Sequence, residues 1–418
     1  MLAISGASFQ NAVYYPNWYV ITATVALVWV ADQLFINLYR SVYGRNFHPQ
    51  MLPTSRITHV LYAFVNIAPS GEVFSADSWA DSEKRYPTDS VNSNGEDVYG
   101  CVKQLYLLKQ ANRHLKVILS VGGATWSSHF ATVARSEQSR QLFAKTSVSL
   151  MKDSGFDGID VDWEYPETQE EARDYVLLLQ TVRHHLDAYA AKHAPSYHFQ
   201  LSIASPAGPQ KYEKLDLSSI SNVVDCLYLI AYDYSGAWDS VAAHQANLYS
   251  STSRPQSTPF STDAAVSAYI AAGVPSRKIV LGMPVYGRSF QNTAGLGDPF
   301  SEVGRGSWQD GVWDNKDLPR PGAREVYDAT LGATYSWDPA TRELISYDSP
   351  LSVQQKAAFI KSRRLGGAMF WEASADNVGN ASLIAALHNE IGVLEPGENH
   401  LCYTDSKYAN VAKGMVAN

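Results

Sequence analysis

The stretch FDGIDVDWEYP, residues 156–166, constrains the fold of this chain more than any other part of the sequence. Side chains alternate between the two faces of a strand, so one face here is apolar and the other carries carboxylates. The carboxylates belong to Asp160, Asp162 and Glu164. An ionised carboxylate that is buried without a partner takes up a proton instead. We therefore predict that the three titrate together, with at least one pKa raised towards that of a general acid.

Two other interpretations of this stretch are weaker. A strand face open to water does not fit the flanking Ile, Val, Trp and Tyr residues, which favour a covered strand. A calcium-binding loop would use the three carboxylates together with Glu171, but such a loop needs glycine at its sixth position. Tyr165 stands there, followed by Pro166. The pattern therefore favours a catalytic site.

The composition supports a large packed core and excludes several classes of partner. Of the 418 residues, 45% are hydrophobic and 18% are charged, and the length suits a barrel enzyme with an insertion. The formal net charge of −8 argues against nucleic acid or an anionic membrane as a partner. Cys101, Cys226 and Cys402 are far apart without a CxxC spacing, so we expect neither a disulfide framework nor a zinc site.

Apolar, β-branched runs alternate with helical periodicity along most of the chain. Eight strands are expected, at Asn11–Trp18, Thr58–Val65, Lys116–Val121, the acidic stretch, His198–Ala204, Val223–Ala231, Lys278–Pro284 and Gly367–Trp371. Helices are expected between them, among others over Val102–Asn112, Glu137–Asp153, Gln169–Lys192 and Leu351–Arg364. This alternation predicts an α/β protein with a parallel sheet closed into a (β/α)8 TIM barrel.

In such a barrel, catalytic side chains lie at the carboxyl ends of the strands. The ends expected here hold Tyr14, Ser120, the acidic stretch, Tyr232, Asp233, Met283, Tyr286, Arg288, Trp371 and Glu372. This set has no cluster of His or Cys for a metal, and Gly122-Gly123 is too short for a phosphate loop, so no metal or cofactor is expected. Carboxylates with aromatic platforms are suited to cleaving glycosidic bonds.

The acidic stretch also resembles the DxxDxDxE signature of glycoside hydrolase family 18, the chitinases, through Asp157, Asp160, Asp162 and Glu164. The resemblance runs from about Asn11 to the tail and is closest to fungal secreted-type chitinases. It implies a small α+β insertion domain between strand 7 and helix 7, along one wall of the substrate groove. The implied organisation is a barrel over residues 11–286 and 349–395, the insertion domain over 287–348 and a tail over 396–418.

The resemblance assigns roles in a retaining, substrate-assisted mechanism, in which the acetamido group of the substrate is the nucleophile and forms an oxazolinium ion. Glu164 matches the general acid and base, and Asp162 the residue that holds the acetamido group. Asp160 would share a proton with Asp162. Tyr232 matches the phenol that binds the acetamido oxygen, and Trp371 the indole beneath the distorted sugar.

Further residues are expected to bind substrate or to support the site. The substrate-binding residues implied are Tyr14, Trp18, Trp126, Asp233, Trp238, Met283, Tyr286 and Arg288. Ser120, with Tyr14, matches the support of the proton relay behind Asp160. Gly122, Gly123 and Asp157 are expected to be structural supports of the site.

Two departures from the family pattern occur in matching motifs. Ile230 replaces the usual Met before Ala-Tyr-Asp, an apolar exchange that should be tolerated. Ala124, in SVGGATWS, replaces an aromatic that forms the platform on the leaving-group side. We expect weaker binding there and less transglycosylation, unless Trp126 or Trp238 fills that platform.

The segment Val20–Ser41 is anomalous. It is apolar enough to suggest a membrane span, but Asp32, Gln33 and Asn37 fall inside it and its flanks show no clear charge bias, so we predict none. Deleting it joins Tyr19 to Val42 and restores the spacing of the family. Its 22 residues correspond to 66 nucleotides, which is compatible with a translated short intron or with a genuine insert.

These observations predict a chitinase that acts as a monomer on chitin and chitooligosaccharides, without nucleic-acid or membrane partners. Two alternatives remain: an endo-β-N-acetylglucosaminidase on N-glycans, which shares the acidic motif, and a chitinase-like lectin. Such lectins lose the catalytic acid, whereas Glu164 is present. The resemblance implies an extracellular protein, although residues 1–10 show no signal peptide, and a cytoplasmic location is the alternative.

Overall fold

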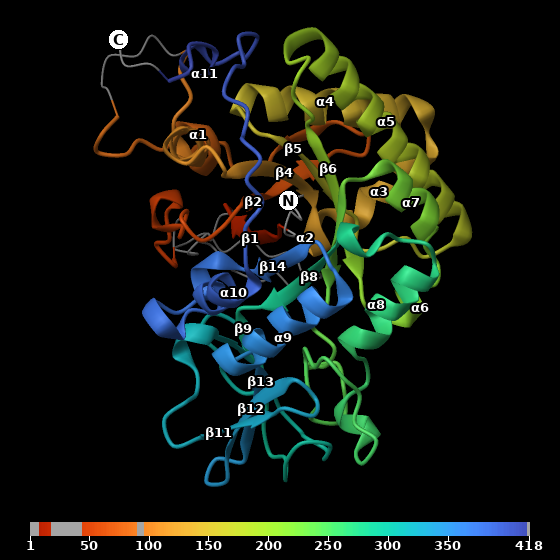
Figure 1. Cartoon of the computed structure of the whole chain (residues 1–418), viewed down its shortest axis with the longest axis vertical. Coiled ribbons are helices and arrows are strands. Elements are labelled where there is room, and N and C mark those ends of the chain that lie inside the picture. The colour runs from red at the N-terminus through yellow and green to blue at the C-terminus, as the bar shows by residue number, and fades with distance from the viewer. Residues whose placement is uncertain (1–7, 18–43, 90–95, 416–418) are drawn as a thin grey trace, which may run out of the picture.

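The computed structural model describes residues 8–17, 44–89 and 96–415 (Figure 1). Trp18 and the anomalous segment Val20–Ser41 lie outside the described residues. In the described part of the chain, no helix is long and apolar enough to cross a membrane.

Eight parallel strands form a closed barrel. They are β1 (Gln10–Pro16), β2 (His59–Ile67), β4 (Lys116–Gly122), β5 (Gly158–Asp162), β6 (Gln200–Pro206), β7 (Cys226–Ile230), β8 (Ile279–Pro284) and β14 (Gly367–Trp371). Their order is β1-β14-β8-β7-β6-β5-β4-β2, and pairing of β2 with β1 closes the ring. The short β3 (Val73–Ser75) runs antiparallel to β2. The predicted (β/α)8 barrel is confirmed.

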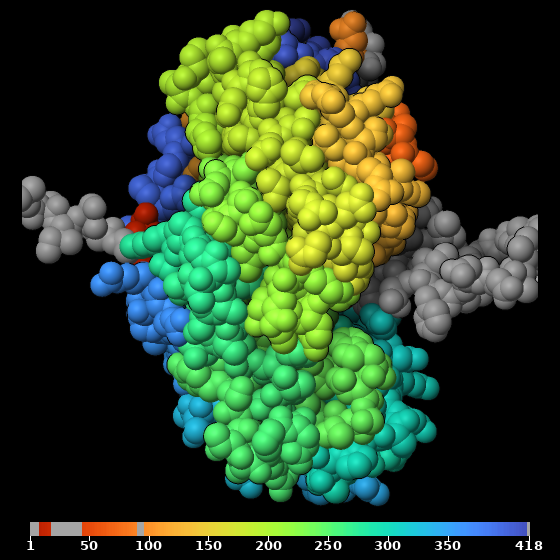
Figure 2. All heavy atoms as spheres, turned by 90° about the vertical axis from the view of Figure 1, so that its right-hand side faces the viewer, coloured from red at the N-terminus to blue at the C-terminus, as the bar shows by residue number. Residues whose placement is uncertain are grey.

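Helices surround the strands (Figure 1), and Figure 2 shows a face of the molecule formed largely by residues from the middle of the chain, coloured yellow to green. The α-helices are α1 (Gly100–Ala111), α2 (Gly123–Trp126), α3 (Phe130–Arg135), α4 (Glu137–Ser154), α5 (Gln169–His193), α6 (Pro209–Tyr212), α7 (Leu217–Val223), α8 (Thr262–Ala271), α9 (Pro350–Arg363), α10 (Leu383–Ile391) and α11 (Ala409–Ala412). Helix α5 begins where Thr168 accepts a hydrogen bond from the Glu171 N–H, a usual N-cap.

The alternation of the strands separates two apolar layers. Outward-facing residues such as Ile159 and Val161 join the large core between strands and helices. Inward-facing residues, including Leu61, Ile118 and Met369, fill the barrel itself. The barrel is therefore packed by side chains, and a cavity can form only at its end.

Strand β7 begins later than the sequence predicts. The expected strand started at Val223, but this residue is the last of α7, and the strand starts at Cys226. Asp225, just before the strand, accepts a hydrogen bond from the Leu201 N–H at 2.8 Å. A short helix followed closely by a strand produces one continuous apolar run, which periodicity alone does not divide.

The long connection after β8 forms a second, antiparallel sheet, which lies below the barrel in Figure 1. Its strands are β9 (Tyr286–Phe290), β10 (Val312–Asp314), β11 (Arg324–Asp328), β12 (Ala333–Asp338) and β13 (Glu343–Tyr347), in the order β10-β9-β13-β12-β11. The only helical turn within residues 287–348 is a 3-10 turn at Asn315–Asp317. The sheet follows β8 after a single residue, Val285, so the barrel directly positions its first strand.

The residues after Pro396 pack against the barrel. The Asn399 side-chain amide donates to the carbonyl oxygens of Lys109, Asn112 and Leu115. Tyr403 is fully buried, and its hydroxyl donates to the Phe156 carbonyl at 2.7 Å. The tail thus connects the end of α1 with the turn that leads into β5.

Candidate active site

Strand β5 is covered on both faces, as its sequence predicts. All five of its residues are buried. On the outward side, Trp163 stacks on Phe130 of α3, with ring centroids 5.4 Å apart and planes 10° apart. The carboxylates of Asp160 and Asp162 consequently face the barrel interior, where water cannot solvate them freely.

Asp160 receives three hydroxyl hydrogen bonds. Ser120 and Tyr14 donate to its Oδ2 at 2.7 and 3.0 Å, and Ser202 donates to its Oδ1 at 2.7 Å. Burial raises the pKa of Asp160, and these three donors oppose the rise because they stabilise the charged form. The predicted support by Ser120 and Tyr14 matches this geometry.

Asp162 has the opposite environment. It is 3% exposed, and its Oδ1 has no hydrogen-bond partner among the described residues. Burial, followed by the negative charges of Glu164 and Asp160, raises its pKa well above the usual value. The two aspartates therefore differ: three donors stabilise the charged form of Asp160, whereas none does so at this oxygen of Asp162.

Glu164 follows the end of β5 and is half-buried. Burial raises its pKa to about 7, and the charge of Asp233 adds to the rise. Hydrogen bonds from the Tyr165 side chain and the Ala124 backbone N–H act in the other direction. A carboxyl group with a pKa near 7 can both donate and accept a proton at neutral pH.

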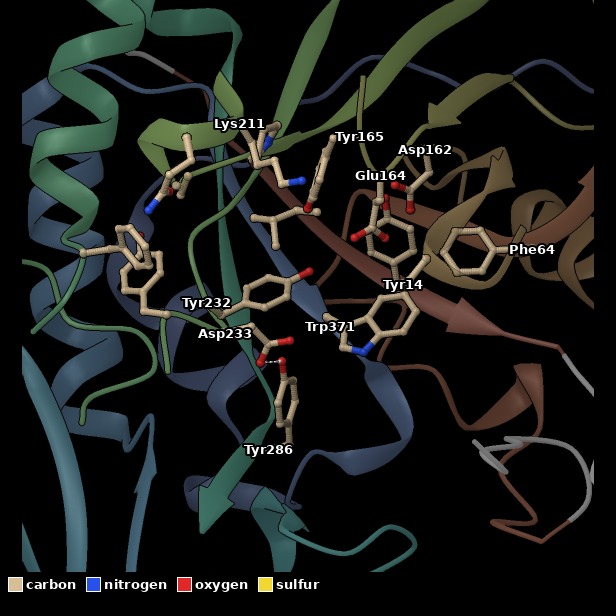
Figure 3. Close-up of a pocket in the computed structure, with 18 residues that line it drawn as sticks. Tyr14, Phe64, Asp162, Glu164, Tyr165, Lys211, Tyr232, Asp233, Tyr286 and Trp371 are labelled. Carbon is tan, nitrogen blue, oxygen red and sulfur yellow. Dashed lines mark hydrogen bonds between the residues drawn. The ribbon is translucent and has the colours of Figure 1, made fainter. Parts of the chain in front are cut away.

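These carboxylates open into a cavity of about 440 Å³ at the carboxyl end of the barrel. Figure 3 shows Asp162 and Glu164 next to each other, with the Trp371 indole below them and Tyr165 and Lys211 further along the cavity. The lining residues are Tyr14, Phe64, Ala124, Asp162, Glu164, Tyr165, Pro206, Ala207, Gly208, Gln210, Lys211, Ile230, Tyr232, Asp233, Tyr234, Phe260, Tyr286 and Trp371.

An aromatic corner lies beneath the carboxylates. The Trp371 ring is 5.1 Å from that of Tyr14 and 5.8 Å from that of Phe64, nearly parallel to the latter at 22°. Trp371 is half-buried, so part of its indole faces the cavity. An exposed indole face is a suitable surface for the apolar side of a sugar ring.

The insertion sheet contributes a polar cluster through its first strand. Tyr286 donates to Asp233 Oδ1 at 2.5 Å and Arg288 to the same oxygen at 2.7 Å. Tyr232 precedes Asp233 and packs on Gly282, where an added Cβ would lie 2.9 Å from the Tyr232 ring. The glycine therefore makes room for the phenol that lines the cavity.

The structure corrects one predicted substrate contact. Met283 is fully buried and belongs to the outer core between strands and helices. Val280, three residues earlier on β8, faces the barrel interior. Residues an odd number of positions apart on a strand point to opposite faces, so Met283 points outward. Met283 therefore does not line the cavity.

Other predicted residues lie beside the cavity or away from it. Trp126 packs on the interior cluster, and Trp238 is 60% exposed, with the Arg288 guanidinium 4.8 Å from its ring.

Asp157 is fully buried just before β5, where its carboxylate pairs with Lys109 at 2.8 Å. Trp18 lies outside the described residues. Glu372 accepts hydrogen bonds from Ser374 and lies 3.4 Å from Arg45.

Sequence reasoning missed several side chains of the site. Ser202 occupies the β6 position that is in register with Asp160, and Ser120 occupies the matching β4 position, so strand register was the available signal. Phe64, Tyr165 and Lys211 also line the cavity. In the described part of the chain, no group of three His, Cys, Asp or Glu residues could hold a metal ion.

Comparison with known proteins agrees with this geometry. Residues 12–376 match the model of the glycosyl hydrolases family 18. Endochitinase 1 of Metarhizium robertsii is 53% identical over 408 residues, covering 98% of this chain and 91% of the relative. Chitinase 1 of Aphanocladium album is 50% identical over 410 residues, covering 98% of this chain and 92% of the relative. The catalytic domain of a psychrophilic chitinase B from Arthrobacter is 28% identical, with a TM-score of 0.81 over 94% of this chain and 97% of that domain.

Proposed function

The chain belongs to the glycosyl hydrolases family 18, and from this membership we propose that it is a chitinase. It hydrolyses β-1,4 bonds between N-acetylglucosamine units of chitin and chitooligosaccharides. The relatives that match almost the whole chain are named chitinases and endochitinases, which supports this substrate. The observation that carries the proposal is the half-buried Glu164, with a pKa of about 7, in an aromatic-lined cavity.

Glu164 is the general acid in this proposal. Its proton goes to the glycosidic oxygen as the bond to the anomeric carbon breaks, and the resulting carboxylate later takes a proton from water. Burial supports the first step because it keeps the carboxyl group protonated up to about pH 7. The same group then serves as the base, since retention requires two steps.

The second carboxylate supports the acetamido group of the substrate. The acetamido oxygen attacks the anomeric carbon, with Tyr232 as its hydrogen-bond donor, and an oxazolinium ion forms. Asp162 accepts the acetamido N–H and stabilises the positive charge once its proton has moved to Asp160. Three hydroxyl donors keep Asp160 in place as the partner for that proton. Water then opens the ring, so the first product is the β-anomer.

The remaining cavity residues hold the sugar chain. Trp371 is the floor beneath the reacting sugar, while Asp233, Tyr286 and Arg288 form polar contacts from the insertion side. In this proposal residues 287–348 are a separate insertion domain that walls the groove, between barrel segments 11–286 and 349–395. The enzyme is a monomer that acts outside the cell, without nucleic-acid or membrane partners.

The test is incubation with chitohexaose and, separately, with a high-mannose glycoprotein. We expect cleavage of the chitohexaose alone, with the β-anomer formed first as observed by NMR. Glu164→Gln should lower turnover by at least about 10²-fold while oligosaccharide binding persists. Glu398→Gln is the matched control, because Glu398 is the more exposed partner of a surface ion pair.

Release of N-glycans would favour the glucosaminidase, and binding without cleavage by the wild type would favour the lectin. An initial α-anomer would contradict the substrate-assisted mechanism.

A further inference from the structure

The backbone of Glu164 lies beyond the support of the barrel ladder. Pairing of β5 with β4 ends at Asp162, and pairing with β6 ends at Val161. The Glu164 N–H instead donates to the Ser127 hydroxyl oxygen at 2.9 Å. A side chain from the 3-10 turn Ser127–His129, which follows α2, therefore replaces the strand as the partner of this amide.

The hydroxyl of Ser127 is itself fixed. It donates to the Gly123 carbonyl at 3.0 Å, while the Asp162 carbonyl is further away, at 3.4 Å. With its proton directed to Gly123, its oxygen accepts the Glu164 N–H. Ser127 thus connects the turn that follows β4 to the residue that follows β5.

This turn lies unusually close to the end of β5. Gly122 and Gly123 have φ values of 109° and 76°, where glycine is favoured. A Cβ at Gly122 would lie 2.4 Å from the Asp162 carbonyl oxygen, and one at Gly123 would lie 2.6 Å from the Phe64 ring. The close approach also brings the Ala124 N–H to the Glu164 carboxylate. The turn therefore contacts the catalytic acid at two points, at its backbone and at its carboxylate.

We propose that Ser127 is a positioning residue for Glu164, whose hydroxyl holds the backbone of the acid so that its carboxyl group meets the glycosidic oxygen. This inference rests on the proposed function, because the position of Glu164 matters only if it is the general acid. Displacing a catalytic group by about 1 Å can reduce the rate by about 10²-fold. Loss of the hydroxyl should therefore lower kcat, with little effect on KM.

Substrates that differ only in their need for an acid separate positioning from simple structural support. Chitohexaose has a poor leaving group that must be protonated, whereas a 2,4-dinitrophenyl chitobioside has a leaving group that departs without a proton. For Ser127→Ala we expect kcat on chitohexaose to fall about 10- to 100-fold and kcat on the dinitrophenyl glycoside to fall less than about 3-fold. Ser127→Thr, which keeps the hydroxyl, should restore most of the activity on chitohexaose.

Two further variants complete the test. Ser128→Ala, at the exposed neighbouring position, is the matched control and should leave both rates unchanged. Glu164→Gln should show the largest difference between the two substrates. If it shows none, Glu164 is not the acid and the proposed function fails together with this inference. If Glu164→Gln affects the two substrates differently, the proposed function stands. If Ser127→Ala then lowers kcat equally on both substrates, or on neither of them, the positioning role alone is overturned.

A pH profile gives a second readout. Asp162, Asp233 and Tyr165 face Glu164 from β5, from the segment after β7 and from the next residue in the chain. The hydrogen bond from the Ala124 N–H lowers the pKa of Glu164. Ser127→Ala should weaken that hydrogen bond, so the pKa should rise and the alkaline limb of kcat/KM should move to higher pH. If Ser127→Ala does not fold, Ser127→Cys, whose thiol is a weaker hydrogen-bonding group, allows the same measurements. An unmoved limb in a folded variant would contradict the proposal.

Discussion

At the scale of single residues, the groups around Glu164 determine how far its pKa lies above the usual value. Burial is the largest influence and raises the pKa to about 7. The Tyr165 hydroxyl and the Ala124 N–H lower it, because both donate to the charged form. Asp233 raises it through like charge. These opposing influences can be separated by substitution.

The alkaline limb of kcat/KM should follow the proton on Glu164, because the first step requires the protonated acid. Activity should therefore fall above about pH 7. Tyr165→Phe removes a donor to the carboxylate, so the pKa should rise and the limb should move to higher pH by about half a unit or more. Asp233→Asn removes a negative charge, so the limb should move to lower pH.

Profiles of kcat/KM against pH for the two variants and the wild type check these directions. Tyr212→Phe, a tyrosine outside the cavity lining, serves as the matched control and should not move the limb. Shifts in the same direction for Tyr165→Phe and Asp233→Asn would contradict the assignment of the limb to Glu164.

Ala124 lines the cavity with a single methyl group where the family usually has an aromatic. An aromatic stacked on a sugar contributes roughly 1 kcal/mol beyond the buried area. Ala124→Trp should therefore bind the leaving-group side about fivefold more tightly and raise the share of transglycosylation products. Mass spectrometry of the products at high chitotetraose concentration measures that share.

Thr125→Trp, one residue further and outside the cavity lining, is the control for this exchange. An unchanged product distribution in Ala124→Trp would mean that another side chain already forms the platform. Trp126, which packs on the interior cluster, and Trp238, which lies against Arg288, are the candidates.

At the scale of elements, the tail after Pro396 and helix α1 support β5 from its amino-terminal end. Lys109 is fully buried, and its ammonium group pairs with Asp157 at 2.8 Å and donates to the His400 carbonyl at 2.9 Å. Asp157 also accepts hydrogen bonds from the Val117 and His400 N–H groups. Asp157, the first acid of the DxxDxDxE pattern, thus connects α1, β4 and the tail to the start of β5. This end of the strand lies away from the cavity.

Removing one partner of this buried pair should destabilise the protein. Lys109→Met leaves the Asp157 carboxylate buried without its cation, which typically costs about 3–5 kcal/mol in the free energy of unfolding. Urea unfolding should show this loss, while the folded variant keeps its kcat on chitohexaose. Lys214→Met, which breaks the more exposed pair with Glu167, should cost less than about 1 kcal/mol. A kcat that falls with Lys109→Met would instead place Asp157 in the catalytic network.

At the scale of the whole molecule, the barrel and the insertion sheet meet at the open end of the barrel. Arg45, from the segment before β2, pairs with Asp314 of β10 at 2.7 Å. The Trp308 indole N–H donates to the same carboxylate at 3.1 Å. These contacts join the segment between β1 and β2, at the carboxyl end of the barrel, to the second sheet.

The segment Val20–Ser41 enters this same loop in the sequence, between β1 and Arg45. Its apolar composition favours aggregation wherever such residues meet water. Deleting it, with Tyr19 joined to Val42, should give a protein that is more soluble and at least as active on chitooligosaccharides. Light scattering and initial rates measure the two effects. A mature transcript that retains the 66 nucleotides would contradict an intron, and a less active deletion variant would make the segment part of the site.

The sequence by itself determined the barrel and its acidic strand. Period-two alternation around Asp160, Asp162 and Glu164, with apolar strands repeated between helices, follows from local pattern alone. The resemblance added the family, which the match over residues 12–376 confirms. Local pattern could indicate which residues lie at the carboxyl ends of the strands, but not which of their side chains contact one another across the barrel.

Only the tertiary structure decided which side chains meet at those ends. Strand register places Ser202 on Asp160, alternation within β8 turns Met283 into the outer core, and the glycine turn after β4 brings Ser127 to Glu164. The pKa of Glu164 likewise depends on burial by residues from several strands. These are long-range relations, set by how the sheet closes and how closely two backbones approach, and short-range sequence periodicity carries no information about either.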